Sequence, residues 1–291
     1  MIQGGGVIGV ELASVYQALG TRCIIVEMLP QILPNLDQEL AAGVAAQLNR
    51  LGVEIYTGAK VLGASKDPAG LKVAVATQAG ERSFLVNKVL AAVGRRPVTQ
   101  GMGLEENGIT LERGRIVVNE YLETSVPGVY AVGDAIGGVM LAHVAFAEGT
   151  VAAENALGKR VKMDYKTVPS CIYTQPAAAS VGLSEAQARE AGFQVKVGRF
   201  PLAANGKALI EADAGGFVKI VTNERYGEIL GVQILGPRAT DLISEAALAL
   251  RLEATVDEIT STIHAHPTII EAVAESALAV DGLALHLPRR G

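Results

Sequence analysis

Hydrophobic and polar positions in the first part of the chain follow two different periods. Residues 4–20 begin with glycines and continue as a helical pattern, and residues 37–51 form an amphipathic helix. The apolar stripe of that second helix consists of Leu40, Val44, Leu48 and Leu51. Apolar runs typical of strands lie at residues 22–27, 53–56, 71–77 and 88–93. Strands that alternate with helices predict an α/β fold with a parallel sheet.

The pattern changes from about residue 166 onward. Strand-like runs at residues 170–173, 194–201, 216–222 and 229–235 come first, and helical patterns at 240–251 and 267–278 follow. Strands grouped before helices predict an α+β domain with an antiparallel sheet. The stretch between the two parts is loop-rich, with one helical pattern at residues 142–157. It is short for a domain that folds alone.

Composition narrows the class of protein. The chain has 291 residues, 49% of them hydrophobic and 19% charged, so it can bury several cores. Its net charge of −5 and the absence of a basic stripe argue against nucleic-acid and anionic-membrane partners. No apolar stretch reaches the ~20 residues of a spanning helix. We expect a soluble cytoplasmic protein, in which Cys23 and Cys171 are buried small hydrophobic residues.

A glycine-rich loop supplies the first candidate binding site. In the Gly-x-Gly-x-x-Gly spacing, Gly4 permits a tight turn, Gly6 lets a pyrophosphate approach the backbone, and Gly9 allows close helix packing. Gly5, Val7 and Ile8 complete the loop. The motif predicts a Rossmann-type dinucleotide site. Only three residues precede it, so the first strand is largely missing and the loop is expected to be weakly anchored.

Glu27 ends the apolar strand that follows the glycine-rich loop. An acidic residue about 20 positions after the glycines binds ribose hydroxyls in Rossmann sites. A carboxylate would repel a 2′-phosphate, so the residue favours NAD over NADP. The alternative is that Glu27 is a solvated residue at the end of a strand.

A histidine pair precedes the last helical pattern. Pro267 suits the first turn of a helix and would place His266 at its entrance. Glu271 lies five residues on, close enough to bond one imidazole nitrogen and fix its tautomer. An imidazole oriented by a carboxylate can act as a base toward a thiol, although many histidines only cap helices. His264 is interpreted as a supporting residue and His286 as incidental, and no metal site is expected.

Four motifs in order resemble those of dihydrolipoamide dehydrogenases, which are flavoprotein disulfide reductases. Val-Gly-Arg-Arg-Pro at 93–97 resembles the end of the family's NAD domain, and Tyr-Ala-Val-Gly-Asp at 130–134 its second flavin motif. Met-Leu-Ala-His at 140–143 resembles the segment that faces the flavin ring. His-Ala-His-Pro-Thr at 264–268 is similar to the family's histidine signature.

The resemblance implies three parts: a truncated Rossmann-type NAD-binding domain over residues 1–97, a short FAD-contacting segment over 98–165, and a dimerisation domain over 166–291. It implies that His266 and Glu271 are catalytic. The implied NAD contacts are the loop from Gly4 to Gly9, Glu27 and Gly94. The implied FAD contacts are Asp134, Met140, Leu141, Ala142 and His143.

The implied reaction is oxidation of dihydrolipoamide by NAD⁺ through FAD and a redox disulfide, with His266 serving the disulfide of the other subunit of a homodimer. The implied partner is the lipoyl domain of a 2-oxoacid dehydrogenase or glycine cleavage complex. Two alternative interpretations are a mercuric or glutathione reductase-like enzyme and a non-catalytic dimerisation or NAD-binding module. Glu27 argues against the members that use NADP, and the tail lacks the cysteine pair that the resemblance would imply for a mercuric reductase.

The family's first domain carries another glycine fingerprint and a Cys-x4-Cys pair, and the sequence contains neither. We therefore expect an amino-terminal truncation of about one domain, ~150 residues, and an isolated chain without activity. The alternatives are that the chain is a natural stand-alone protein, or that it is one half of a protein whose other half is a separate chain.

Overall fold

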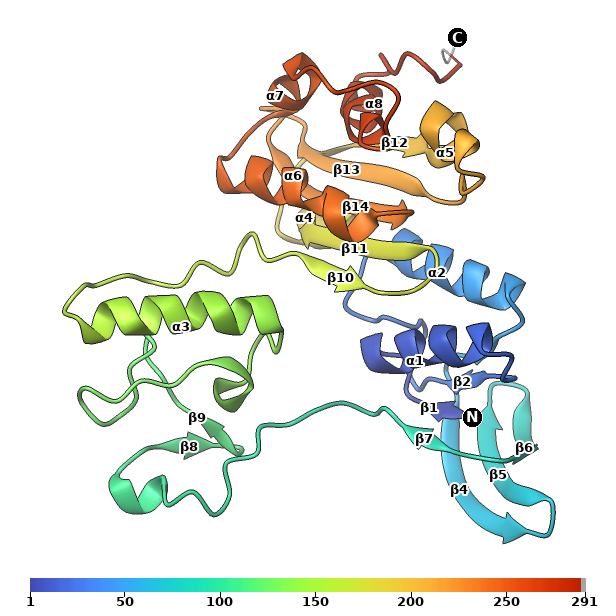
Figure 1. Cartoon of the computed structure of the whole chain (residues 1–291), viewed down its shortest axis with the longest axis vertical. Helices are drawn as coiled ribbons and strands as arrows, with labels where there is room; N and C mark the ends of the chain where they lie inside the picture. The colour runs from blue at the N-terminus through green and yellow to red at the C-terminus, as the bar shows by residue number, and fades with distance from the viewer. Residues whose placement is uncertain (289–291) are drawn as a thin grey trace. The chain divides into compact units, whose positions relative to one another are not determined.

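A computed structural model describes residues 1–288 of the chain. Two compact units are present, one formed by Met1–Val93 together with the chain from Thr167 onward, and the other by Gly94–Lys166. Figure 1 labels most of the helices and strands of both units.

A four-stranded parallel sheet forms the start of the first unit, in the order β3-β2-β1-β7. Its strands are β1 (Ile2–Gln3), β2 (Ile24–Val26), β3 (Glu54–Tyr56) and β7 (Leu90–Ala91), and its helices are α1 (Val7–Ala18) and α2 (Gln38–Arg50). Asp37 caps α2 by accepting hydrogen bonds from the backbone of Glu39 and Leu40. The predicted parallel α/β arrangement is confirmed here.

Strand β1 has two residues and nevertheless lies in the interior of this sheet. Ile2 pairs with Ile25 of β2 on one side and with Leu90 of β7 on the other. The Gly4 nitrogen then donates to the Val26 carbonyl at 2.9 Å. The expectation of a weakly anchored loop was therefore wrong, because neighbours on both sides supply the hydrogen bonds that the short strand needs.

A separate antiparallel sheet corrects another expectation. Strands β4 (Lys60–Asp67), β5 (Gly70–Thr77) and β6 (Gly80–Val86) form a three-stranded meander, whereas residues 71–77 were expected in the parallel sheet. The two outer strands escaped prediction because most of their residues are polar or exposed. Val73 and Val75 of β5 are buried and share a core with Ile24 and Val26 of β2.

The rest of the first unit has a five-stranded antiparallel sheet in the order β10-β11-β14-β13-β12. The strands are β10 (Ser170–Ile172), β11 (Ala177–Gly182), β12 (Val195–Pro201), β13 (Phe217–Asn223) and β14 (Ile229–Gly236). This confirms the predicted α+β architecture. Strand β11 was not predicted, because its sequence Ala-Ala-Ala-Ser-Val-Gly has few of the β-branched or aromatic residues typical of strands.

Helices cover both faces of this sheet. The long ones are α6 (Ala239–Arg251) and α8 (Glu271–Val280), and the short ones are η3 (Leu202–Ala204), α4 (Glu185–Glu190), α5 (Gly206–Ile210) and α7 (Val256–Ser261). Successive residues of β13 point to opposite faces. Val218 and Ile220 pack in one core with Ile243 of α6 and Val273 of α8, whereas Phe217 packs with the α2 core.

Helix α8 begins at Glu271 rather than at Pro267. Pro267 follows a cis peptide bond after His266, and residues 267–270 form bends that end in a turn at residue 270. The Thr268 backbone donates to the Glu271 carboxylate at 2.7 Å, and its hydroxyl donates to the Ala265 carbonyl at 2.6 Å. These bonds hold the segment out of the helix, so His266 lies in a loop five residues before α8 begins.

The second unit has few regular elements. These are η1 (Glu105–Asn107), β8 (Leu111–Glu112), β9 (Arg115–Ile116), η2 (Gly133–Ile136) and α3 (Ala142–Ala156). Its small core contains Ile116, Leu122, Ile136 and Ala152. The loop-rich character and the single long helix agree with the sequence pattern.

Candidate functional site

The glycine-rich loop joins β1 to α1, as the dinucleotide motif requires. Gly6 is the N-cap of α1, Val7 and Ile8 open the helix with exposed side chains, and Gly9 lies buried in its first turn. The first backbone N–H groups of a helix have no partner inside it and carry partial positive charge. The loop thus ends at a surface suited to an anionic group.

At two of these glycines, neighbouring backbone atoms leave no room for a side chain, whereas a third glycine faces open space. A Cβ at Gly4, whose φ is +104°, would lie 2.3 Å from the Ala92 carbonyl oxygen, and one at Gly9 would lie 2.0 Å from the Gly4 carbonyl oxygen. A Cβ at Gly6 would meet nothing within 4 Å. The space beside Gly6 allows a ligand to approach the backbone, whereas Gly4 and Gly9 shape the turn.

Glu27 is not the solvated strand end that the sequence left open as an alternative, because it is only 9% exposed. Its Oε2 accepts a hydrogen bond from the Gly5 nitrogen at 2.6 Å, and its Oε1 accepts one from the Leu29 nitrogen at 2.8 Å. The carboxylate therefore joins the end of β2 to the glycine-rich loop. Each oxygen keeps a lone pair, so a hydroxyl of a ligand can still bind.

Two motifs that were singled out separately meet in the second unit. Arg95 Nη1 donates to Asp134 Oδ2 at 2.7 Å, and Arg95 Nη2 donates to the Met140 carbonyl oxygen. Both charged side chains are about half exposed. Sequence reasoning did not select Arg95, although it lies inside the quoted Val-Gly-Arg-Arg-Pro motif. Gly94 precedes it with a φ of +119°, and its contact with NAD remains a prediction.

Leu141, Ala142 and His143 form the start of α3. Leu141 is the extended N-cap, and Ala142 and His143 are the first helical residues. The first turn of α3 thus presents backbone N–H groups beside the segment that holds Asp134 and Met140. Such an end favours a negatively charged group.

Glu148 is a buried carboxylate on α3 that the sequence analysis missed. It is 2% exposed, its Oε2 accepts from the Gly133 nitrogen at 2.7 Å, and its Oε1 accepts from the Tyr165 hydroxyl at 2.8 Å. Burial, together with the bond to Glu148 and its charge, raises the pKa of Tyr165 to about 12. Glu148 thereby holds the turn that carries Asp134.

His266 and Glu271 form the hydrogen bond that the sequence led us to expect. Nδ1 of His266 lies 2.9 Å from Oε1 of Glu271, while Oε2 of Glu271 accepts from the Thr268 nitrogen. Because an ionised carboxylate only accepts hydrogen bonds, Nδ1 carries the proton, and Nε2 of the neutral ring is left as an acceptor. The His266 side chain is 78% exposed, so Nε2 is accessible to an incoming group.

The charge state of Glu271 supports this tautomer. Partial burial raises the pKa of the carboxyl group, but the hydrogen bonds from the Thr268 backbone and the His266 ring outweigh that effect. The pKa of Glu271 is therefore lowered, and the group is a carboxylate at neutral pH.

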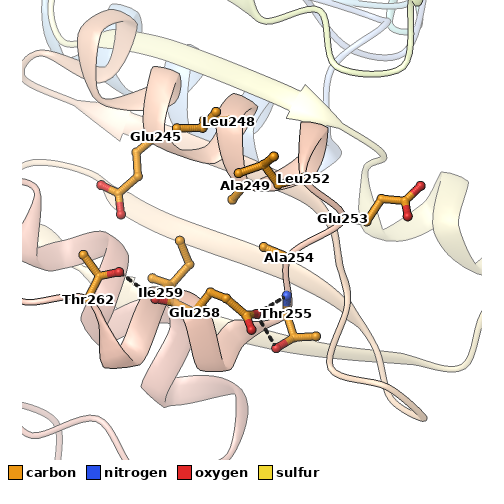
Figure 2. A pocket seen from close by; sticks show the side chains of 10 residues that line it. All are labelled: Glu245, Leu248, Ala249, Leu252, Glu253, Ala254, Thr255, Glu258, Ile259 and Thr262. Carbon is orange, nitrogen blue, oxygen red and sulfur yellow. Dashed lines mark hydrogen bonds between the residues drawn. The ribbon is translucent and has the colours of Figure 1, made fainter.

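His264 is held inside the domain. Its side chain is 8% exposed, Nε2 lies 2.9 Å from Oε1 of Glu245, and Nδ1 lies 3.0 Å from the Thr262 carbonyl oxygen. Figure 2 shows Glu245 of α6 and Thr262 of the loop after α7 on the wall of the same cavity, which has a volume of about 450 Å³. These bonds fix the segment that leads to His266, in agreement with a supporting role.

The two cysteines occupy different environments. Cys23 is buried as expected, whereas Cys171 is only partly buried, and both are free thiols. Burial raises the pKa of each. Within residues 1–288 no group of three or more histidine, cysteine, aspartate or glutamate side chains could hold a metal ion. No helix in the same range is both long and apolar enough to cross a membrane.

Comparison with known protein families identifies both parts of the chain. Residues 1–149 match the family model described as pyridine nucleotide-disulphide oxidoreductase. Residues 168–277 match the model for the dimerisation domain of the same family.

Curated relatives and solved structures agree with these matches. The chain is 46% identical to a dihydrolipoyl dehydrogenase of Thermus scotoductus, covering 100% of this chain and 63% of the relative. It is 44% identical to one from Bacillus subtilis, covering 98% of this chain and 61% of the relative. The chain thus spans about three fifths of the length of these relatives.

Among solved structures, LpdA from Mycobacterium tuberculosis superposes with a TM-score of 0.86 at 30% identity, covering 95% of this chain and 60% of LpdA. The flavoprotein disulfide reductase RclA from Escherichia coli superposes with a TM-score of 0.87 at 29% identity, covering 95% of this chain and 62% of RclA. The observed fold is therefore found in flavoprotein disulfide reductases.

Proposed function

Because this chain belongs to the pyridine nucleotide-disulphide oxidoreductase family, we propose that it contributes the NAD-binding, flavin-contacting and dimerisation parts of a dihydrolipoyl dehydrogenase. The observation that carries the proposal is the hydrogen bond between His266 and Glu271, with the other imidazole nitrogen accessible. The similarity to dihydrolipoyl dehydrogenases over the whole chain supports the choice of substrate.

In this proposal His266 is the acid–base group for a dithiol substrate. Glu271 fixes the imidazole so that Nε2 accepts the thiol proton, and the carboxylate stabilises the imidazolium ion that forms. The proton can return from Nε2 to a thiolate in the reverse direction. An exposed ring suits a substrate that arrives on a mobile arm, and we propose the lipoyl domain of a 2-oxoacid dehydrogenase or glycine cleavage complex as the partner.

We propose NAD as the nucleotide and FAD as the flavin. The open space beside Gly6 and the N-terminus of α1 fit a pyrophosphate, and Glu27 fits a ribose hydroxyl without offering a partner to a 2′-phosphate. Asp134 and the first turn of α3, at Leu141 to His143, fit the polar parts of a flavin nucleotide. Bound FAD would supply electron transfer between sulfur and nicotinamide.

The redox disulfide is proposed to come from polypeptide other than residues 1–291, because Cys23 and Cys171 are free thiols and burial raises their pKa values. A thiol with a raised pKa is a poor nucleophile at neutral pH. We further propose that the dimerisation domain pairs two subunits, so that His266 serves the disulfide of the partner subunit. The location proposed is the cytoplasm, where such thiols stay reduced.

A two-part experiment tests the proposal. The purified chain is titrated with NAD⁺ and with NADP⁺ by isothermal calorimetry, and NADH formation from dihydrolipoamide is then assayed with added FAD. We expect binding of NAD⁺ in preference to NADP⁺ and no turnover by the chain alone. We expect turnover when the chain is joined to the amino-terminal domain of the Thermus scotoductus relative, and its loss in the H266Q variant. Equal turnover by H266Q would contradict the role of His266.

A further inference from the structure

A buried lysine of the dimerisation domain contacts the end of a segment that begins at the NAD site. Residues 28–36, called here the 28–36 segment, connect Glu27 at the end of β2 with Asp37, the cap of α2. Lys219 of β13 lies 3.2 Å from Oδ2 of Asp37, and the two side chains are 5% and 4% exposed. Separating a buried ion pair would leave an uncompensated charge, so this contact fixes the place where the segment ends.

The 28–36 segment packs directly on the glycine-rich loop. The Leu33 nitrogen donates to the Gly5 carbonyl oxygen at 2.8 Å, and the Leu36 nitrogen donates to the Leu33 carbonyl oxygen at 2.9 Å. Ile32 is 1% exposed, and its Cγ2 would lie 2.9 Å from a Cβ at Gly5. Both the backbone and a buried side chain of the segment therefore support the loop.

Strand β13 of the dimerisation domain supplies an apolar and a charged contact to this region. Phe217 and Lys219 are two positions apart, so their side chains lie on the same face of the sheet. Phe217 belongs to the same buried core as Ile32 and Leu33, while Lys219 binds Asp37. The segment is thus held between the glycine-rich loop on one side and β13 on the other.

We infer that Lys219 is a positioning residue for NAD binding, because it holds Asp37 at the end of the 28–36 segment. An anchored segment keeps its bond to Gly5, and Gly5 in turn keeps its bond to the ribose-binding carboxylate of Glu27. Lys219 touches no part of the nucleotide in this scheme. The inference rests on the proposed function, since it makes the dimerisation domain a contributor to the proposed NAD site.

Two further carboxylates face Lys219 and allow its charge to be separated from its effect on the segment. Oε2 of Glu39 lies 3.4 Å from the ammonium group, and Oε2 of Glu185 lies 3.3 Å from it. Glu39 is the second residue of α2 and also forms an ion pair with Arg199. Glu185 belongs to α4, so a change there alters the surroundings of Lys219 without altering the 28–36 segment or its cap.

The test compares D37N with E185Q in the full chain by calorimetric titration with NAD⁺ and with ADP-ribose, which lacks the nicotinamide. Each variant removes one negative charge beside Lys219, but only D37N alters the end of the 28–36 segment. Asparagine caps a helix about as well as aspartate, so α2 keeps its cap. We expect D37N to bind both nucleotides roughly 2- to 30-fold more weakly, the range for changes that act through a network of contacts. E185Q should bind them like the unmodified chain.

K219M and the double variant K219M/D37N complete a double-mutant cycle. We expect K219M to lose nucleotide affinity and the double variant to lose no more than K219M, because Lys219 acts through Asp37. Losses that multiply in the double variant would overturn the inference. Unchanged affinity in D37N, or an equal loss in E185Q, would also overturn it. Circular dichroism establishes which variants are folded, and the comparison of D37N with E185Q decides the matter if K219M does not fold.

Amide hydrogen exchange of Leu33 provides a second readout that needs no ligand. We expect this amide to exchange faster in D37N than in E185Q, and by a larger factor than amides of the five-stranded sheet, which report global unfolding. An unmodified chain that binds neither NAD⁺ nor ADP-ribose would contradict the proposed function, and the exchange of Leu33 would still test the inference. Equal exchange of Leu33 in D37N and E185Q would overturn the inference even in a chain that binds NAD⁺.

Discussion

The carboxylate of Glu27 accepts a 2.6 Å hydrogen bond from the backbone nitrogen of Gly5, 22 positions earlier in the chain. The bond joins the end of β2 to the loop between β1 and α1, and a second bond from the Leu29 nitrogen fixes the other carboxylate oxygen. A residue selected for ribose binding therefore also holds the glycine-rich loop in place.

We expect E27Q to weaken both the fold and NAD binding. A hydrogen bond to a charged group contributes about 1.5–3 kcal/mol, and glutamine keeps only one oxygen to serve two backbone donors. Urea unfolding should show a lowered midpoint, and calorimetry a weaker affinity for NAD⁺. The control E81Q changes an exposed glutamate of β6 and should alter neither quantity. Normal NAD⁺ affinity in E27Q would contradict the ribose role.

Two glycine-to-alanine variants should separate loop geometry from ligand contact. In G9A the new methyl carbon would lie 2.0 Å from the Gly4 carbonyl oxygen, so the loop or α1 must shift, at a cost of about 1–3 kcal/mol. In G6A the methyl carbon meets no atom within 4 Å, so any loss of stability should be small and arise only because alanine is a poorer N-cap than glycine. Both variants should bind NAD⁺ weakly.

The measurement for this pair combines thermal unfolding with an NAD⁺ titration of each variant. A stable G6A variant with undiminished NAD⁺ affinity would show that the ligand does not approach the backbone at Gly6.

Lys219 should be a strong determinant of stability in the first unit. Its side chain is 5% exposed and lies 3.2 Å from Asp37, 3.4 Å from Glu39 and 3.3 Å from Glu185. Removing one partner of a buried ion pair leaves an uncompensated charge and costs about 3–5 kcal/mol. We expect K219M to lower the urea midpoint accordingly.

The comparison variant is K207M, because Lys207 forms an ion pair with Glu211 while 30% exposed. Partly exposed pairs contribute roughly 0–1 kcal/mol, so K207M should change stability little. Restoration of stability in the double variant K219M/D37N, relative to K219M, would support the charge argument. Equal stability of K219M and K207M would refute it.

Tyr165 should titrate at a higher pH than is ordinary for a tyrosine. Its folded pKa of about 12 lies above the ordinary value of 10.0, because burial and Glu148 disfavour the phenolate. Its hydrogen bond to Glu148 therefore contributes stability fully below pH 10, and that contribution is lost as the pH rises toward 12. We expect Y165F to be less stable than the unmodified chain at pH 8 and the difference to shrink with increasing pH.

The ionisation of Tyr165 is measured by the absorbance of tyrosinate at the alkaline end of a pH titration. The unmodified chain should show a late step that Y165F lacks. Y226F, which alters an exposed tyrosine, should retain that step. A late step that persists in Y165F would assign it to another residue.

Several elements could be predicted because their signals are local. Helix α2 was expected at residues 37–51 and spans Gln38–Arg50, since its apolar stripe and the capping Asp37 lie within one segment. The hydrogen bond from His266 to Glu271 was expected for the same reason, as five positions separate the two residues. Strands β4, β6 and β11 were missed because pairing with neighbours, rather than their own composition, makes them strands.

The sequence alone therefore determined the glycine-rich turn, the histidine–glutamate pair and the two kinds of sheet, because each depends on residue spacing along a continuous stretch of chain. Tertiary structure decided the partners of buried and paired charges. Lys219 meets Asp37 across 182 positions, and Arg95 meets Asp134 across 39. Such pairs carry no periodic signal, since they form only when strands and helices from distant segments pack and exclude water from the charges between them.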